Sequence, residues 1–117
     1  MKHLPSPKAS ETPHFLYAAL LSDAVVKVGV TWNPRNRSQQ LALKLKPRTL
    51  VAMDAFQLGR GARRHVAERE LIERMSRIGR QIVPHREFFA GVSFEDATAL
   101  ALAIAAKSTA PAAEAQA

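Results

Sequence analysis

In the first half of the chain, the apolar positions are grouped in short runs that are typical of β-strands. Residues 14–21 (HFLYAALL) and 25–30 (VVKVGV) are two such runs, and only a few mostly polar residues separate them. Apolar runs joined by so short a connection predict an antiparallel hairpin. Residues 49–58 (TLVAMDAFQL) form another run that ends at a Gly-Arg-Gly sequence, and they predict a third strand.

A helix is predicted between the second and third strands. Asn33 followed by Pro34 is a helix start signal, because asparagine suits the N-cap and the fixed φ of proline suits the first helical position. The helix should end near Lys44, since Pro47 cannot continue it.

Two further helices are predicted in the second half of the chain. Residues 62–78 repeat apolar side chains at helical spacing, and Gly79 follows them as a C′ residue. Ser93 and Asp96 have the spacing of a capping box, which opens a last helix that should reach about Lys107.

These elements predict a small α+β domain, with a central antiparallel sheet of about three strands flanked by three helices. A chain of 117 residues holds one domain, and we assign it to residues 14–107. A short aromatic segment at 86–90 is a further strand candidate. The polar, proline-bearing residues 1–13 and the small residues of 108–117 are predicted to be disordered.

The composition excludes several classes of site. The chain has no cysteine, which excludes disulfides, thiolate metal sites and cysteine nucleophiles. Its longest uncharged apolar-rich run, 97–106, is shorter than the roughly 20 residues that a membrane span requires. The N-terminal residues lack the apolar stretch of a signal peptide. We therefore expect a cytoplasmic protein that does not associate with a membrane.

Positive charge is concentrated in the middle of the sequence. The net charge is +7, and residues 35–86 contain thirteen basic but only four acidic residues. This density predicts a polyanionic partner, most simply nucleic acid, although a merely solvated surface has the same composition. Acidic lipid is a weaker alternative, because no segment combines a basic face with a bulky apolar one. The positions expected to follow a DNA backbone are Arg35, Lys44, Lys46, Arg48, Arg60, Arg63 and Arg64.

One acidic residue of the 62–78 helix has an unusual position. At about 100° per residue, Glu68 falls about 60° from Leu71 and so lies in the apolar sector, whereas Glu73 faces solvent. A carboxylate on the core side needs a cation as its partner. That partner is either an arginine in an ordinary ion pair or a metal ion, since magnesium is often held by one carboxylate, waters and a substrate phosphate.

Four motifs in order resemble the GIY-YIG endonuclease superfamily. They are Phe15-Leu16-Tyr17, Lys27-Val28-Gly29 with Thr31 two residues later, Arg37 eight residues after the glycine, and Glu68 within Ala67-Glu68-Arg69-Glu70-Leu71-Ile72. The branch most similar is the phage-type DNA-binding domain. Its second motif reads Lys-Ile-Gly, and its chain ends in a Glu-Trp-Phe-like element, here Glu87-Phe88-Phe89. The resemblance spans residues 14–105.

The resemblance implies a divalent-metal-dependent DNA endonuclease that hydrolyses phosphodiester bonds. By position, Tyr17 would lie beside the scissile phosphate and deprotonate the attacking water, and Lys27 takes the place of the second motif's tyrosine. Arg37 would contact the phosphate and offset the charge of the transition state. Glu68 would bind one divalent cation, Mg²⁺ or Mn²⁺, near the leaving oxygen. Such hydrolysis needs a base, a cation and a positioned nucleophile.

The chain also departs from the family pattern. Phe15 replaces the first motif's glycine, Lys27 replaces the tyrosine, and Gln40 and Leu41 stand where a histidine or tyrosine would follow Arg37. These departures leave two other functions open: a catalytically weak or inactive DNA-binding module on the same fold, and a structural or protein-interaction role. Because 117 residues hold no separate recognition module, sequence specificity would need a protein partner or a homodimer.

Several candidate residues also have a plainer interpretation. Tyr17 suits a strand simply by packing, and Arg37 suits a solvated helix face. His65 and His85 lack the spacing of a metal motif and are predicted to be surface residues. Trp32 is the only tryptophan, and it either stacks on a base or caps the core.

Overall fold

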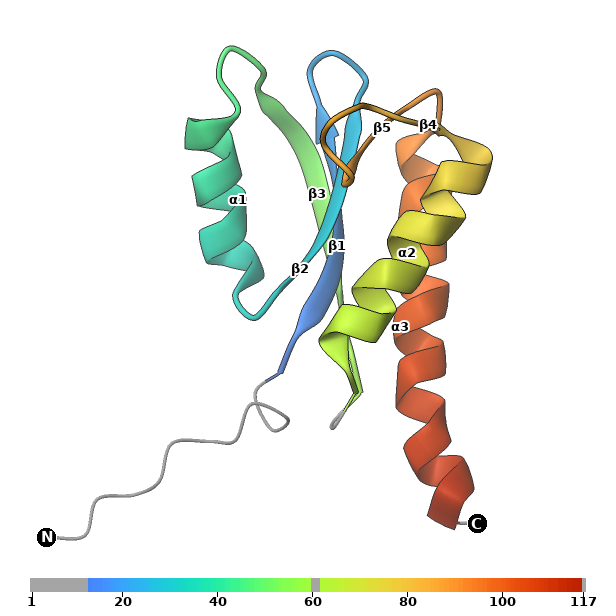
Figure 1. Ribbon diagram of the computed structural model, residues 1–117. Helices are drawn as coiled ribbons and strands as arrows, with labels where there is room; N and C mark the ends of the chain where they lie inside the picture. The colour runs from blue at the N-terminus through green and yellow to red at the C-terminus, as the bar shows by residue number, and fades with distance from the viewer. Residues whose placement is uncertain (1–12, 60–61, 117) are drawn as a thin grey trace, which may run out of the picture.

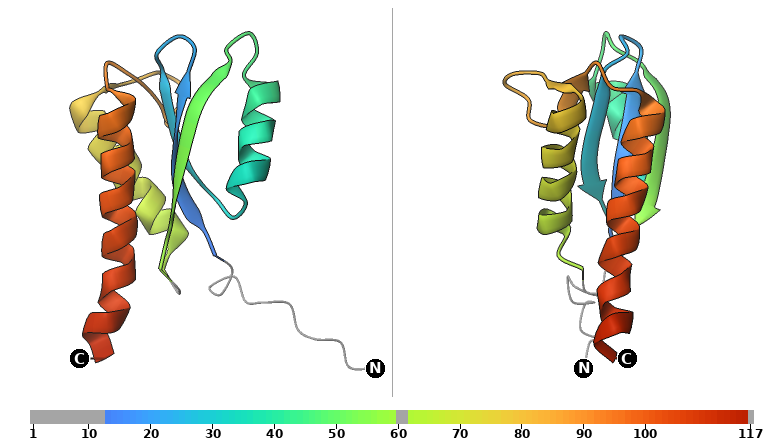
Figure 2. Two further views of the ribbon diagram at one scale, coloured as in Figure 1. Left: turned by 180° about the vertical axis from the view of Figure 1, so that it is seen from behind. Right: turned by 90° about the vertical axis from the view of Figure 1, so that its right-hand side faces the viewer.

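The computed structural model describes residues 13–59 and 62–116, with side chains in the last helix described up to Ser108. An antiparallel sheet stands between α1 on one face and α2 with α3 on the other (Figure 1, Figure 2). The elements in chain order are β1 (Phe15–Leu21), β2 (Val26–Thr31), α1 (Pro34–Lys44), β3 (Leu50–Gln57), α2 (Arg64–Ile78), β4 (Arg80–Gln81), β5 (Phe88–Ala90) and α3 (Phe94–Gln116).

The described residues form a five-stranded sheet in the order β3-β1-β2-β5-β4. Every neighbouring pair is antiparallel, and β1 lies between β2 and β3. The predicted α+β class is therefore confirmed, and so are the hairpin and the third strand. The predicted number of about three strands is wrong, because β5 and β4 extend the sheet beyond β2. They are only three and two residues long, which is too short for a period-two pattern to show in the sequence.

Alternation along β1 divides its side chains between the two faces of the sheet. Leu16 and Ala18 join the larger core, which lies under α2 and α3 and includes Leu71. Tyr17 points to the opposite face, where it packs in a smaller cluster with Leu41 of α1. Tyr17 is thus placed on the α1 side of the sheet, where the candidate site is formed.

Two helices begin at the polar caps that the sequence predicts. Asn33 Oδ1 accepts a hydrogen bond of 3.0 Å from the backbone N–H of Asn36, and Ser93 Oγ accepts one of 3.0 Å from that of Asp96. Each bond satisfies a helix N–H that has no partner within the helix. The predicted bounds of α1, Pro34 to Lys44, are confirmed.

The ends of α2 and α3 differ from the prediction. Gly79 follows α2, but its φ of −134° is extended and not left-handed, so it does not serve as a C′ glycine. A side chain at Gly79 would instead crowd the carbonyl oxygen of Ala90, which lies 3.0 Å from where a Cβ would stand. The helix α3 continues past its predicted end at Lys107, so the segment predicted to be a disordered tail is helical up to Gln116.

Two predictions concern membranes and the N-terminal arm. None of the helices in the described part of the chain has the length and apolarity needed to cross a bilayer. The predicted arm, 1–13, lies outside the described residues except for Pro13.

Candidate active site

Tyr17 and Lys27 meet across the β1–β2 hairpin. The register places Tyr17 opposite Gly29 and Lys27 opposite Ala19, so the two side chains share one face of the sheet as diagonal neighbours. Lys27 Nζ donates a hydrogen bond of 2.7 Å to Tyr17 Oη and lies 5.2 Å from the centroid of the phenol ring. Strand pairing therefore fixes two of the predicted site residues in direct contact.

Gly29 makes room for the tyrosine ring. A Cβ atom on Gly29 would stand 2.6 Å from Tyr17 Oη and 2.7 Å from its Cζ. Non-bonded carbon atoms prefer separations of about 3.5–4.0 Å, so no side chain fits there while the ring stays in place. The glycine of the second motif is thus a packing requirement of Tyr17.

Burial dominates the electrostatics of Tyr17. The residue is 1% exposed, and burial raises the pKa of its phenol from 10.0 to about 12. The positive charge of Arg37 lowers this pKa, whereas the negative charges of Glu68 and Glu87 raise it further. Tyr17 is therefore a neutral phenol at physiological pH, and the neighbouring cations do not convert it into a phenolate.

Lys27 is half-buried, and its pKa moves in the other direction. Its Nζ lies 5.6 Å from the centroid of the Phe88 ring. Burial has the largest effect and lowers the pKa of the ammonium below its ordinary 10.5. The charge of Glu87 raises this pKa, Arg37 lowers it, and Glu68 raises it. An amine with a lowered pKa is a better proton acceptor near neutral pH than the buried phenol beside it.

Arg37 brings an unpartnered donor to the site. It lies near the start of α1, and its charge acts on both Tyr17 and Lys27. Its Nε is buried and has no hydrogen-bond partner among the described residues. A buried N–H without a partner is unfavourable, and a guanidinium can bind a phosphate through two parallel hydrogen bonds. The Arg37 side chain is therefore suited to an anionic ligand. A solvated position on the helix surface would not leave a buried donor without a partner.

Glu68 projects from α2 into a polar hollow and not into the core. The hollow has a volume of about 250 Å³ and is lined by His65, Glu68, Arg69, Ile72, Arg86 and Glu87. The Glu68 side chain is half-buried, and no ion pair ties it to a basic residue within residues 13–59 and 62–116. The alternative of an ordinary arginine ion pair is therefore not found in this range. Helical spacing predicted that Glu68 lies among the core-facing side chains. In the structure it lines the hollow, which opens beside the apolar face of α2.

The oxygen donors of this hollow suit a hard cation. Mg²⁺ is usually held by one or two carboxylates together with waters and substrate phosphates, and Glu68 and Glu87 supply two carboxylates. In the described part of the chain, no three His, Cys, Asp or Glu side chains are grouped as a metal site made by protein alone would require. The residues present therefore fit a cation that is shared with a phosphate ligand.

Glu87 is the site residue that sequence reasoning missed. Its carbonyl oxygen accepts a hydrogen bond of 2.9 Å from the backbone N–H of Val28, which follows Lys27. Its charge acts on Tyr17 and Lys27, and its side chain lines the same hollow as Glu68. The one signal in the sequence is an acidic residue directly before two aromatic residues, which resembles a family motif but does not by itself indicate a role for the Glu87 side chain.

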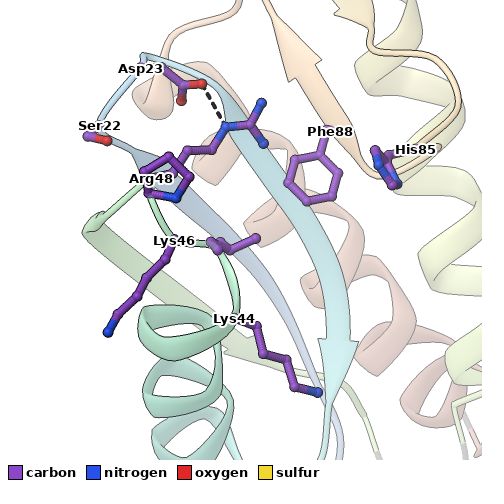
Figure 3. A pocket seen from close by; sticks show the side chains of 9 residues that line it. Ser22, Asp23, Lys44, Lys46, Arg48, His85 and Phe88 are labelled. Atoms are coloured by element: carbon purple, nitrogen blue, oxygen red, sulfur yellow. Dashed lines mark hydrogen bonds and ion pairs between the residues drawn. The ribbon is translucent and has the colours of Figure 1, made fainter.

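Three of the positions expected to follow DNA lie together. Lys44 ends α1, and Lys46 and Arg48 are in the loop after it. All three line a hollow of about 750 Å³ on the α1 side of the molecule (Figure 3). This hollow is next to the Tyr17–Lys27 pair, because Phe88 contacts Lys27 and also lines the hollow.

The other predicted DNA contacts are elsewhere. Arg35 is exposed near the start of α1, and Arg63 and Arg64 lie at the start of α2. None of these three arginines lines the larger hollow. Arg60 lies outside the described residues.

His65, His85 and Trp32 lie at the surface. His65 and His85 are exposed as predicted, and each lines one of the two hollows. Trp32 is 62% exposed, so it does not cap the core. Its indole ring remains available to a ligand that approaches the start of α1.

Comparison of the chain with protein-family models, with curated proteins and with solved structures found no match. The charges of Arg37 on α1, Glu68 on α2 and Glu87 before β5 all act on Tyr17 of β1 and Lys27 of β2.

Proposed function

We propose that this chain is a divalent-metal-dependent DNA endonuclease of the GIY-YIG type, which hydrolyses phosphodiester bonds. The observation that carries the proposal is the Lys27–Tyr17 hydrogen bond over Gly29, with the charges of Arg37 and Glu68 acting on that pair. A proton acceptor, a phosphate-binding cation and a carboxylate for a metal are the groups that phosphodiester hydrolysis needs.

Arg37 binds the scissile phosphate in this proposal. Its buried Nε supplies a donor for which the described part of the chain has no acceptor. A phosphate oxygen would complete that hydrogen bond, and the guanidinium charge would offset the charge that develops in the transition state. Substrate binding would thereby give the buried Nε–H of Arg37 the hydrogen-bond partner that it lacks among the described residues of the free protein.

The Tyr17–Lys27 pair accepts the proton of the attacking water. The phenol alone is a poor base, because burial raises its pKa to about 12. The amine is the member whose pKa is lowered, so it is the group that gains the proton. The phenol Oη then holds the amine in position by accepting its hydrogen bond.

Glu68 holds the divalent cation, with Glu87 in the same hollow as a second oxygen donor. When bound, Mg²⁺ or Mn²⁺ supplies positive charge for the leaving oxygen. The absence of an ion pair on Glu68 within the described residues leaves its carboxylate available for this role.

DNA is the proposed partner, bound mainly through its backbone. Basic side chains at Lys44, Lys46 and Arg48 provide phosphate contacts that position a strand but read no sequence. A second copy of the chain or a protein partner would supply sequence specificity.

A second candidate function is a DNA-binding module that cleaves slowly or not at all. It is favoured by the burial of Tyr17, which leaves little of the ring open to a substrate. This module predicts binding that weakens steeply with salt, because binding then rests on phosphate contacts.

Incubation with supercoiled plasmid separates the two functions. The protein is tested with Mg²⁺, with Mn²⁺ and with a chelator, and binding is followed in parallel by gel shift. Nicking that requires metal supports the endonuclease. A gel shift without nicking under any metal condition supports the binding module, and neither nicking nor a shift contradicts both.

A further inference from the structure

The hollow of about 750 Å³ places planar groups beside the basic side chains that the proposed function assigns to the DNA backbone. The lining residues that matter here are Asp23, Lys44, Lys46, Arg48, His85 and Phe88. Phe88 also contacts Lys27, with the ammonium 5.6 Å from its ring centroid. A ligand in the hollow would therefore lie beside the candidate active site.

Arg48 is held in a fixed position within this hollow. Its Nε donates a hydrogen bond of 2.8 Å to Asp23 Oδ2, and its guanidinium carbon lies 5.6 Å from the centroid of the Phe88 ring. Figure 3 shows the Arg48 side chain extended between these two residues. Among the described residues that line the hollow, Asp23 has the only acidic side chain, and this ion pair uses it.

His85 provides a second planar group. Its ring centroid lies 5.3 Å from that of Phe88, with an angle of 59° between the rings. Phe88 itself is only 7% exposed, so the planes open to a ligand are the imidazole of His85 and the guanidinium of Arg48. Aromatic side chains and guanidinium planes are the surfaces on which unpaired bases stack.

Lys44 and Lys46 supply charge that the protein does not neutralise. Both side chains are exposed, and neither forms an ion pair in the range that the structure describes. Figure 3 shows both on the side of the hollow opposite His85, Lys44 at the end of α1 and Lys46 in the loop after it, with their side chains pointing in different directions. Successive phosphates of a strand are the ligands that suit two such ammonium groups.

We infer that this hollow is a subsite for one nucleotide of the bound strand. Lys44 and Lys46 bind its phosphate and the neighbouring phosphate of the strand, and its base stacks against His85 and Arg48. Asp23 acts as a positioning residue for Arg48. The inference rests on the proposed function, since it takes nucleic acid as the substrate, and it adds that the strand beside the reacting phosphate has an unpaired base.

The test is a binding measurement in chelator, so that cleavage cannot contribute. A short fluorescein-labelled single strand is titrated against the wild-type protein and against Lys44→Gln/Lys46→Gln, at several salt concentrations. The loss of two phosphate contacts should lower the slope of log K against log salt by about 1.4. The control Arg74→Gln/Arg77→Gln removes the same charge from the exposed face of α2 and should leave the slope unchanged.

Stacking is tested with His85→Ala and two labelled strands. One strand carries bases and the other consists of abasic sites. His85→Ala should weaken binding of the strand with bases about fivefold or more and should not affect the abasic strand. Equal affinity of His85→Ala and wild type for the strand with bases would overturn the inference, and so would equal slopes for the two double variants.

The inference and the proposed function fail in different ways. If the wild-type protein neither nicks nor shifts plasmid DNA, the proposed function fails. If the wild type binds and nicks DNA but the hollow variants behave like their control, only the nucleotide subsite is wrong.

Discussion

Gly29 lies directly opposite Tyr17 in the β1–β2 pair, and a methyl group on its Cα would reach to 2.6 Å from the phenol oxygen. The phenol ring therefore occupies the space that any other residue at position 29 would fill. This relationship connects two motifs of the sequence by packing alone, and it presents Tyr17 Oη to Lys27.

Gly29→Ala should destabilise the fold by roughly 2 kcal/mol, because the ring has to move or the strands have to separate. Chemical unfolding in urea measures this change. The overlapping atoms lie at the far end of the ring, and Tyr17→Leu lacks them. In a Tyr17→Leu background the same glycine substitution should therefore cost at least about 1 kcal/mol less. An equal cost in both backgrounds would mean that the clash with Tyr17 is not the cause.

The phenol should titrate at a pKa of about 12 in the folded protein and at 10.0 in the urea-unfolded chain. Tyr17 is the only tyrosine, so the phenolate absorbance reports this residue alone. Because the folded pKa is raised, the stability linked to Tyr17 is fully present below pH 10.0 and is lost as the pH rises through about 12. A folded-state titration near 10.0 would show that the ring is not buried as described.

Arg37→Met should slow nicking strongly without harming stability. The wild-type side chain buries an N–H with no partner in the described residues, so its removal should stabilise the fold by up to about 1 kcal/mol. Loss of the phosphate contact should lower the nicking rate about a hundredfold. Urea unfolding and a plasmid assay on the same preparation check both. A variant that is less stable than wild type would indicate a structural role for Arg37.

Sequence reasoning predicted those parts of the fold that long patterns and local chemistry encode. The β1–β2 hairpin, the third strand and the cap at Asn33 follow from apolar runs and from one asparagine side chain. β5 lies within the strand candidate at 86–90, but β4 has only two residues, which form a strand only because a neighbouring strand pairs with them. The continuation of α3 to Gln116 was not predicted, because its small and polar residues are typical of disorder, although alanine, which is frequent among them, favours a helix.

For the candidate site, the sequence supplied the residues but not their environment. Tyr17 and Lys27 are in contact, and the charges of Arg37 and Glu68 act on both, but Glu68 lies in a polar hollow and not in the core. Glu87 was missed because its role depends on the pairing of β5 with β2, a contact that spans distant parts of the chain.

Glu87→Gln should shift the pH dependence of nicking. Glu87 raises the pKa of Lys27, so removing its charge lowers that pKa further. If Lys27 gains the proton of the attacking water, the rate rises with pH through the pKa of Lys27, and this rise should occur at lower pH in the variant. Glu95→Gln, on the exposed first turn of α3, is the matched control and should not shift it. A shift toward higher pH would contradict the role given to Lys27.

The central claim is tested most directly by the metal-dependent nicking rate of Glu68→Gln beside that of Glu73→Gln. Both carboxylates are on α2, but Glu68 lines the polar hollow and Glu73 is exposed in a surface ion pair with Arg77. We expect Glu68→Gln to fold and bind DNA normally while nicking at least about a hundredfold more slowly, and Glu73→Gln to match wild type. Equal rates for the two variants, or nicking by wild type that persists in chelator, would contradict the account.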